Sequence, residues 1–125
     1  MAEFLVVGIG GALGAMLRYS FNTRIIGFMG SDFPWGTFAV NVMGSFLIGL
    51  TAILLDGKTN GSHYLRLGLM VGALGGFTTF SAFSADTLHL LETQQWFRAM
   101  IYISASVLLC IVAAAAGMTA ARQLS

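Results

Sequence analysis

Residues 72–84 read GALGGFTTFSAFS and lie near the middle of a long apolar segment that runs from Leu65 to Leu91. Each glycine of the pair Gly75-Gly76 weakens a helix by roughly 1 kcal/mol relative to alanine. The pair Thr78-Thr79 follows, and a threonine can cap a helix that begins again. The run predicts either a helix broken at Gly75-Gly76, at a depth where transporters place ion sites, or a glycine kink that serves packing alone.

Three further apolar segments accompany this one: Phe4 to Phe21, Trp35 to Leu55 and Trp96 to Ala121. Each reaches the length of about 18 residues at which an apolar stretch is interpreted as a membrane-spanning helix. The chain is 57% hydrophobic and only 9% charged, whereas soluble domains carry about 25% charged residues. We therefore expect an all-α integral membrane protein, a single four-helix transmembrane domain over residues 1–125 with polar connections at 21–34, 56–64 and 92–95.

Positive charge is divided evenly between the two sides of this predicted membrane protein. Three residues, Arg18, Arg24 and Arg98, fall on one side, and Lys58, Arg66 and Arg122 fall on the other. Orientation is normally set by an excess of Lys and Arg on the cytoplasmic side. A chain without that excess should insert both ways, which predicts an antiparallel, dual-topology homodimer. The net charge of +1 and the lack of a basic run give no indication of a nucleic-acid partner.

Phe80 and Phe83 are three positions apart and share one face of a helix, and Ser81 and Ser84 form a second such pair on an adjacent face. The edges of aromatic rings carry partial positive charge, so they can hold an anion without a fixed cation. Packing is the commoner role of a phenylalanine pair at this spacing. The pattern alone leaves both roles open.

Polar side chains also occur in the second and fourth segments. Asn41, with Thr37 one turn earlier, can either join helices or donate a hydrogen bond to a passing anion. Tyr102, Ser106 and Cys110 recur every four residues and form one polar stripe on an otherwise apolar helix. Polar groups inside a membrane are candidates for function, although Ser and Tyr are weaker candidates than charged residues.

Charged residues stand near the ends of the segments. Arg18 can extend its side chain to the membrane surface, or it can give a vestibule a positive potential that concentrates anions. Asp86 and Glu92 lie toward one end of the third segment. Glu3 stands where a secretory signal would carry basic residues, so we expect the first segment to be retained. The sequence has no catalytic or metal-ligand spacing, and we do not expect an enzyme.

Together these residues resemble the signature of the Fluc-type (CrcB) fluoride channels. The resemblance rests on residues 75–84, on GGALGAMLRY at 10–19, on WGTFAVN at 35–41 and on the Tyr102/Ser106 stripe. It implies an antiparallel homodimer in the bacterial plasma (inner) membrane, with two pores along the dimer interface. Such a protein exports cytoplasmic fluoride passively and with high selectivity over chloride, which relieves fluoride toxicity.

The resemblance also implies roles for individual residues. Ring edges of Phe80 and Phe83 coordinate the ion, and Asn41 donates a hydrogen bond to it. Further polar positions along the fluoride pathway are Thr37, Ser81, Ser84, Tyr102 and Ser106. Backbone carbonyls of Gly75 and Thr78, from both subunits, hold a structural Na⁺ at the dimer centre, and Arg18 is the vestibule arginine. Cys110 is a departure, because some relatives have a hydroxyl residue there.

Two other classes of protein share features with this chain. A small multidrug-type, dual-topology exporter has the same size and four helices, but it needs a carboxylate inside the membrane, and none is suitably placed here. A structural subunit of a larger membrane complex is the second alternative. The dense polar and aromatic pattern of the third segment counts mildly against it.

Overall fold

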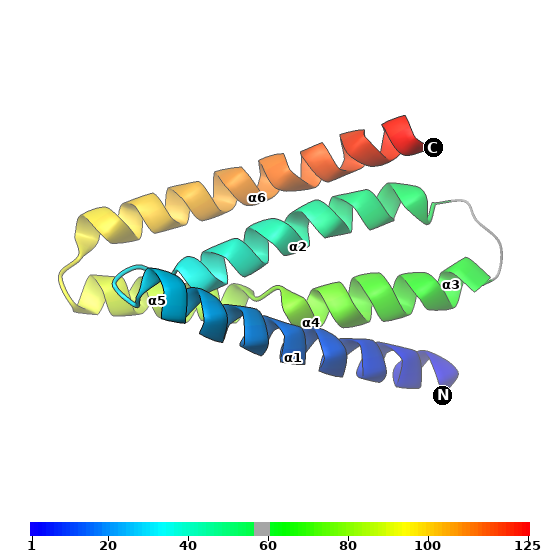
Figure 1. Ribbon diagram of the computed structural model, residues 1–125, viewed down its shortest axis with the longest axis horizontal. Coiled ribbons are helices and arrows are strands. Elements are labelled where there is room, and N and C mark those ends of the chain that lie inside the picture. The colour runs from blue at the N-terminus through cyan, green and yellow to red at the C-terminus, as the bar shows by residue number, and fades with distance from the viewer. Residues whose placement is uncertain (57–60) are drawn as a thin grey trace.

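Four helical rods run side by side along the long axis of the molecule in a computed structural model that describes residues 1–56 and 61–125 (Figure 1). The elements in chain order are α1 (Ala2–Met29), α2 (Trp35–Leu54), α3 (Gly61–Arg66), the π-helix η1 (Leu67–Leu74), α4 (Gly75–Phe77), α5 (Phe80–Glu92) and α6 (Trp96–Leu124). The third rod consists of α3, η1, α4 and α5. Both chain termini lie at the same end of the bundle, as four crossings require.

All four rods are long and apolar enough to cross a membrane, over Ala2–Met29, Trp35–Leu54, His63–Glu92 and Trp96–Leu124. Many large apolar side chains point outward, among them Phe4 and Ile9 on α1 and Leu108 and Val112 on α6. A soluble protein of this size would rarely expose so much apolar surface. The expected all-α architecture with four spanning helices is therefore confirmed.

The first helix is longer than the sequence predicted. We expected it to end at Phe21, yet α1 continues to Met29. Residues 22–29 carry Ile25, Ile26 and Phe28 and contain no proline, so nothing stops the helix before Gly30. Gly30 has a φ of 84°, which glycine adopts readily because it has no Cβ, and its N–H donates to the carbonyl oxygen of Ile26. The predicted loop at 56–64 is also partly wrong, because α3 begins at Gly61; residues 57–60 of that loop, including Lys58, lie outside the described residues.

The second and fourth rods pack closely because small residues meet at their interface. A Cβ atom at Gly117 of α6 would collide with the carbonyl oxygen of Phe46, and one at Gly49 of α2 would collide with that of Ala114. Close approach through small residues is the usual way in which membrane helices associate. This contact fixes α2 and α6 as one wall of the bundle, and α1 packs against η1 on the other side.

The third rod departs from helical geometry at Thr78 and Thr79, whose ψ angles are 156° and 116°. The predicted position of the break, Gly75-Gly76, is wrong: Gly75 has helical angles of −63° and −38°, and both glycines belong to α4. Gly76 instead allows close packing, since a Cβ atom there would lie 2.6 Å from the carbonyl oxygen of Gly11. The Thr78 hydroxyl bonds to the carbonyl oxygen of Leu74, and the Thr79 hydroxyl caps the helix that begins at Phe80.

Candidate functional site

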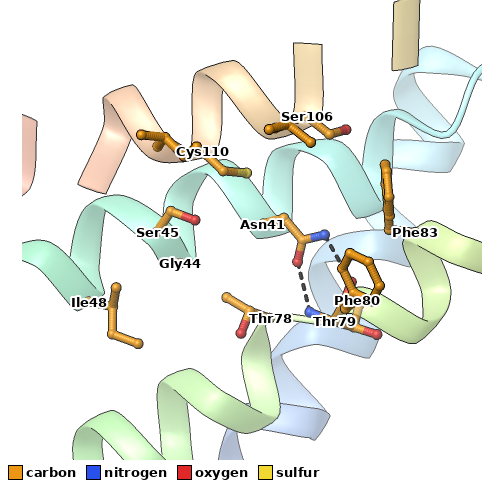
Figure 2. A pocket seen from close by; sticks show the side chains of 12 residues that line it. Asn41, Gly44, Ser45, Ile48, Thr78, Thr79, Phe80, Phe83, Ser106 and Cys110 are labelled. Carbon is orange, nitrogen blue, oxygen red and sulfur yellow. Dashed lines mark hydrogen bonds between the residues drawn. The ribbon is translucent and has the colours of Figure 1, made fainter. Parts of the chain in front are cut away.

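Asn41 binds the backbone of the extended segment. Its side-chain nitrogen donates to the carbonyl oxygen of Thr79 at 3.0 Å, and its side-chain oxygen accepts from the N–H of Thr79 at 2.7 Å (Figure 2). Backbone groups released inside a membrane must find such partners, because the hydrocarbon supplies none. Asn41 therefore joins α2 to the third rod, which is one of the two roles that the sequence left open.

Thr79 begins the next helix, as the sequence predicted for one of the two threonines. Its hydroxyl accepts a hydrogen bond from the N–H of Ala82 at 3.1 Å and lies 3.1 Å from the hydroxyl of Ser81. The Thr78 hydroxyl bonds backward, to the carbonyl oxygen of Leu74 at 2.9 Å. The two threonines thus end one helix and start another within two residues.

These contacts divert the N–H groups that would bond Gly75 and Thr78 in a continuous helix. The N–H of Thr79 would donate to the carbonyl of Gly75, but it donates to Asn41 instead. The N–H of Ala82 would donate to the carbonyl of Thr78, but it donates to the Thr79 hydroxyl. Gly75 is also exposed on the surface of the chain. The two carbonyl oxygens are therefore available for another partner.

A cavity of about 340 Å³, here called the Asn41 cavity, lies between α2, α6 and the break in the third rod. Its lining is mostly apolar with a few polar groups: Asn41, Gly44, Ser45, Ile48, Thr78, Thr79, Phe80, Phe83, Ser106, Val107, Cys110 and Ile111 (Figure 2). An apolar cavity with a few placed polar groups is the usual form of a small-ligand site. It brings together five of the residues predicted from the sequence: Asn41, Thr78, Phe80, Phe83 and Ser106.

Phe80 and Phe83 pack against each other at one side of the Asn41 cavity. Their ring centroids lie 5.4 Å apart with the rings tilted by 40°. The Phe83 ring also packs against the ring of Tyr102, with the two centroids 5.1 Å apart. Phe80 is 77% exposed in the single chain although it lines the cavity. The cavity is therefore incomplete on the side of Phe80.

Ser106 lines the opposite wall and has an unusual environment. It is 6% exposed, and its buried hydroxyl finds no hydrogen-bond partner among the residues that the structure describes. A buried hydroxyl without a partner is unfavourable by about 1–3 kcal/mol. Ser106 lines the cavity, but its hydroxyl oxygen is closed off from the cavity space.

Tyr102 is fully buried, and its hydroxyl donates to a carboxylate oxygen of Asp86 at 3.1 Å. The sequence placed Tyr102 correctly on the stripe but did not connect Asp86 with it. The signal available was the presence of a carboxylate in an apolar segment, which is rarely accidental. Asp86 is half-buried on α5, toward one end of the rod, and it lines a different cavity from Asn41.

A second cavity, of about 210 Å³, lies on the other side of the break and holds Arg18. It is lined by Ala15, Arg18, Tyr19, Asn22, Thr37, Val40, Thr79 and Ala82. Thr79 lines this cavity and the Asn41 cavity alike. Thr37 and Asn22 also line a third cavity, of about 400 Å³, which contains Asp86 and Arg98. The predicted residues Arg18 and Thr37 thus form a separate polar group beside the Asn41 cavity.

The remaining predicted residues line none of these three cavities. Ser84 donates to the carbonyl oxygen of Phe80 at 3.0 Å, and Ser81 is exposed near Thr79. Within residues 1–56 and 61–125, no group of three His, Cys, Asp or Glu side chains could hold a metal ion.

Four apolar spans with polar groups gathered at an internal helix interruption define a multi-pass membrane protein. A family model described as "CrcB-like protein, Camphor Resistance (CrcB)" matches residues 5–118. The chain belongs to the CrcB family, as the resemblance in the sequence indicated.

Relatives in this family carry the name "Fluoride-specific ion channel FluC". One from Geobacter sulfurreducens is 48% identical and aligns over 99% of this chain and 100% of its own length. One from Rhizobium etli is 49% identical, over 99% of both chains. One from Magnetococcus marinus is 41% identical, over 93% of this chain and 94% of its own. The likeness therefore extends over nearly the whole chain.

Proposed function

We propose that this chain forms a passive, fluoride-selective channel that exports cytoplasmic fluoride across the bacterial plasma membrane. The observation that carries the proposal is the Asn41 cavity, where two phenylalanine rings and an unpartnered serine hydroxyl lie beside a helix interruption. The names of the relatives support fluoride as the ion. Family membership also weighs against the multidrug exporter and the structural subunit as alternatives.

Weak, neutral donors would replace part of the hydration shell of the anion. The NH2 group of Asn41 has two hydrogens, and Thr79 receives one of them, so the other is available. The Ser106 hydroxyl can donate, and the edges of Phe80 and Phe83 carry partial positive charge. Such donors bind an anion without the strong attraction of a fixed cation, which would slow its release.

Arg18 would act at a distance from this path. It lines the second cavity with Thr37, and that cavity meets the Asn41 cavity at Thr79. A guanidinium there raises the local concentration of anions through its potential, without direct coordination. Tyr102, Asp86 and the serines Ser81 and Ser84 would line or position the remaining polar route.

An antiparallel homodimer would complete the site. Phe80 is 77% exposed, and Gly75 and Ser81 are exposed nearby, so a second copy of opposite orientation can cover the open side of the Asn41 cavity. Each copy brings one Asn41 cavity, so two-fold symmetry gives two pores. The even division of Lys and Arg supports insertion in both orientations.

The diverted carbonyl oxygens fit a structural Na⁺ between the copies. Gly75 and Thr78 each have a carbonyl whose helical N–H partner bonds elsewhere. Neutral carbonyl oxygens suit a hard cation, and one chain offers too few of them, so a partner would have to supply others. When bound, the ion would add charge stabilisation at the interface, while Asn41 and Thr79 hold the interruption open from within each chain.

Export would follow from the chemistry of a weak acid. Neutral HF crosses membranes and ionises at the higher cytoplasmic pH, which traps fluoride inside. A negative-inside potential drives the anion out through a passive path, by about 2.3 kcal/mol per 100 mV for one charge. The test is growth of a fluoride-sensitive bacterial strain on fluoride medium. The chain should restore growth, its Asn41→Asp variant should not, and equal growth of strains with and without the chain would contradict the export role.

A further inference from the structure

Asn22 stands where two of the cavities meet. It lines the second cavity, which holds Arg18, and it also lines the third cavity, of about 400 Å³. Among the described residues, only Thr37 shares this position between the two. Thr79 in turn joins the second cavity to the Asn41 cavity. Asn22 therefore belongs to a series of three adjoining cavities that begins near the connection between α1 and α2.

The amide of Asn22 is free to bind a molecule in these cavities. The residue is half-buried, and no hydrogen bond joins its side chain to another residue that the structure describes. The Ser106 hydroxyl also has no partner, but it is sealed from the surroundings, whereas the Asn22 amide is not among the sealed groups. Its NH2 group therefore has donor hydrogens that can reach an occupant.

Gly36 at the start of α2 gives this amide its room. A Cβ atom at Gly36 would collide with the side-chain oxygen of Asn22 and would lie 3.2 Å from the Asn22 Cα. The amide oxygen thus packs on the glycine, and the amide nitrogen lies farther from it. Any larger residue at position 36 would have to displace the amide.

The charges around Asn22 favour an anion as the occupant. Arg18 stands one turn earlier on the same face of α1, and its guanidinium gives the second cavity a positive potential. The third cavity holds Arg98 together with the carboxylates of Asp32 and Asp86, and His89 also lines it. An anion that moves from the third cavity into the second leaves the carboxylates and approaches Arg18. Asn22 offers a neutral donor at that passage.

We propose that Asn22 is a further residue of the fluoride path, that its NH2 group binds the anion between the third and the second cavity, and that Gly36 keeps the amide in place. The inference rests on the proposed function, because it requires fluoride to pass Arg18. An entry site fills by mass action, so its loss slows transport most when fluoride is scarce. A purely structural role would reduce the number of working channels and would lower efflux by the same factor at every concentration.

The experiment measures the initial rate of fluoride efflux from liposomes loaded with fluoride over a wide range of concentrations. We expect Asn22→Ala to lower the rate about tenfold at low fluoride, as for the loss of one hydrogen bond to a charged group. The loss should shrink as fluoride rises and fills the weakened site. Asn22→Asp keeps the size of the side chain but repels the anion, so its loss at low fluoride should be larger. The matched control is Thr23→Ala, because Thr23 is the exposed neighbour of Asn22 and lines neither cavity; its efflux should be normal throughout.

Gly36→Ala tests the placement of the amide. Alone, it should give the same dependence on fluoride concentration as Asn22→Ala, because it displaces the amide. Added to Asn22→Ala, it should have no further effect, since the colliding group is then absent. Normal efflux of Asn22→Ala at low fluoride, or an equal loss at all concentrations, would overturn the inference while the unmodified chain still conducts. If the unmodified chain releases no fluoride, the proposed function fails first, and that sample alone identifies the failure.

Discussion

Asn41 and Thr79, 38 positions apart in the sequence, exchange two hydrogen bonds where the third rod leaves helical geometry. An amide can do this because its donor nitrogen and its acceptor oxygen are bonded to the same carbon, so the two can reach the N–H and C=O of one residue together. A carboxylate has no donor, and a hydroxyl is too small to reach both groups. The pairing therefore explains why an asparagine stands at this position of α2.

Asn41→Asp tests this pairing and the anion path together. The carboxylate cannot donate to the carbonyl of Thr79, and if ionised it repels an anion. We expect almost no fluoride efflux and a free energy of unfolding lower by about 1–3 kcal/mol, the range for a buried polar group that loses its partner. Thermal unfolding in detergent and liposome efflux measure the two effects separately. Normal flux would remove Asn41 from the path, and unchanged stability would contradict the structural role of the pair.

The double variant Phe80→Met, Phe83→Met separates ion coordination from packing. Phe80 is 77% exposed in a single chain, so the fold of that chain depends little on the Phe80 ring. Swaps that conserve volume usually destabilise a protein by less than about 1.5 kcal/mol. We expect a folded protein with much slower fluoride efflux, because methionine lacks the positive ring edge. Efflux at the original rate would assign both rings to packing alone.

Gly44→Ala tests the close contact between α2 and the interruption. A Cβ atom at Gly44 would collide with the Thr78 side chain and would lie 3.3 Å from the ring of Phe77. Thr78 cannot move easily, because it is β-branched and its hydroxyl bonds to Leu74. We expect destabilisation by about 1–3 kcal/mol, as for other overpacked sites.

The matched control for that variant is Gly27→Ala, because a Cβ atom at Gly27 meets nothing within 4 Å. An exposed helical glycine changed to alanine should leave stability unchanged or raise it by up to about 1 kcal/mol. Both variants are compared by thermal unfolding in the same detergent. Equal stability of the two variants would contradict the close approach of Gly44 to Thr78.

Gly75→Val tests the proposed homodimer. Within one chain, a Cβ atom at Gly75 has only an ordinary contact, 3.6 Å from the carbonyl oxygen of Met70. A strong defect would therefore have to arise from a second copy or from a cation shared with it. We expect a smaller dimer fraction in detergent and less fluoride efflux, with the helical content of the chain retained. A normal dimer with normal efflux would remove Gly75 from the interface.

Added lysines test the dual orientation. With three Lys or Arg on each side, a tag at the C-terminus should appear in both compartments in similar amounts. Two or three extra lysines in the connection between α1 and α2 should make the orientation uniform and lower fluoride export, because antiparallel partners become scarce. A uniform orientation of the unmodified chain would contradict dual insertion.

Most of the fold could be predicted because apolar length alone defines a spanning helix. The predicted start of the second and fourth segments, Trp35 and Trp96, agrees with α2 and α6. The end of α1 could not be predicted, because residues 22–29 are neither continuously apolar nor interrupted by a strong helix breaker before Gly30. Membrane hydropathy does not report how far a helix continues beyond the bilayer.

The sequence predicted several residues of the candidate site, but it did not predict the contacts between them. The glycine pair suggested a break at Gly75-Gly76, whereas the break lies at Thr78 and Thr79. Local helix propensity does not reveal that Gly76 packs on Gly11 or that Asn41 binds the backbone of Thr79. The bond between Asp86 and Tyr102 joins two helices and leaves no periodic signal in either. Contacts between distant segments depend on packing, which a single sequence does not contain.

Fluoride-gradient-driven efflux from liposomes that contain the purified chain tests the central claim most directly. An ion-selective electrode follows external fluoride after an ionophore for K⁺ removes the opposing potential, and chloride-loaded liposomes serve as the control. We predict rapid release of fluoride with chloride retained, and near-complete loss of that release in Asn41→Asp. Retention of fluoride by liposomes with the folded chain, or release of chloride at the same rate, would contradict a fluoride-selective channel.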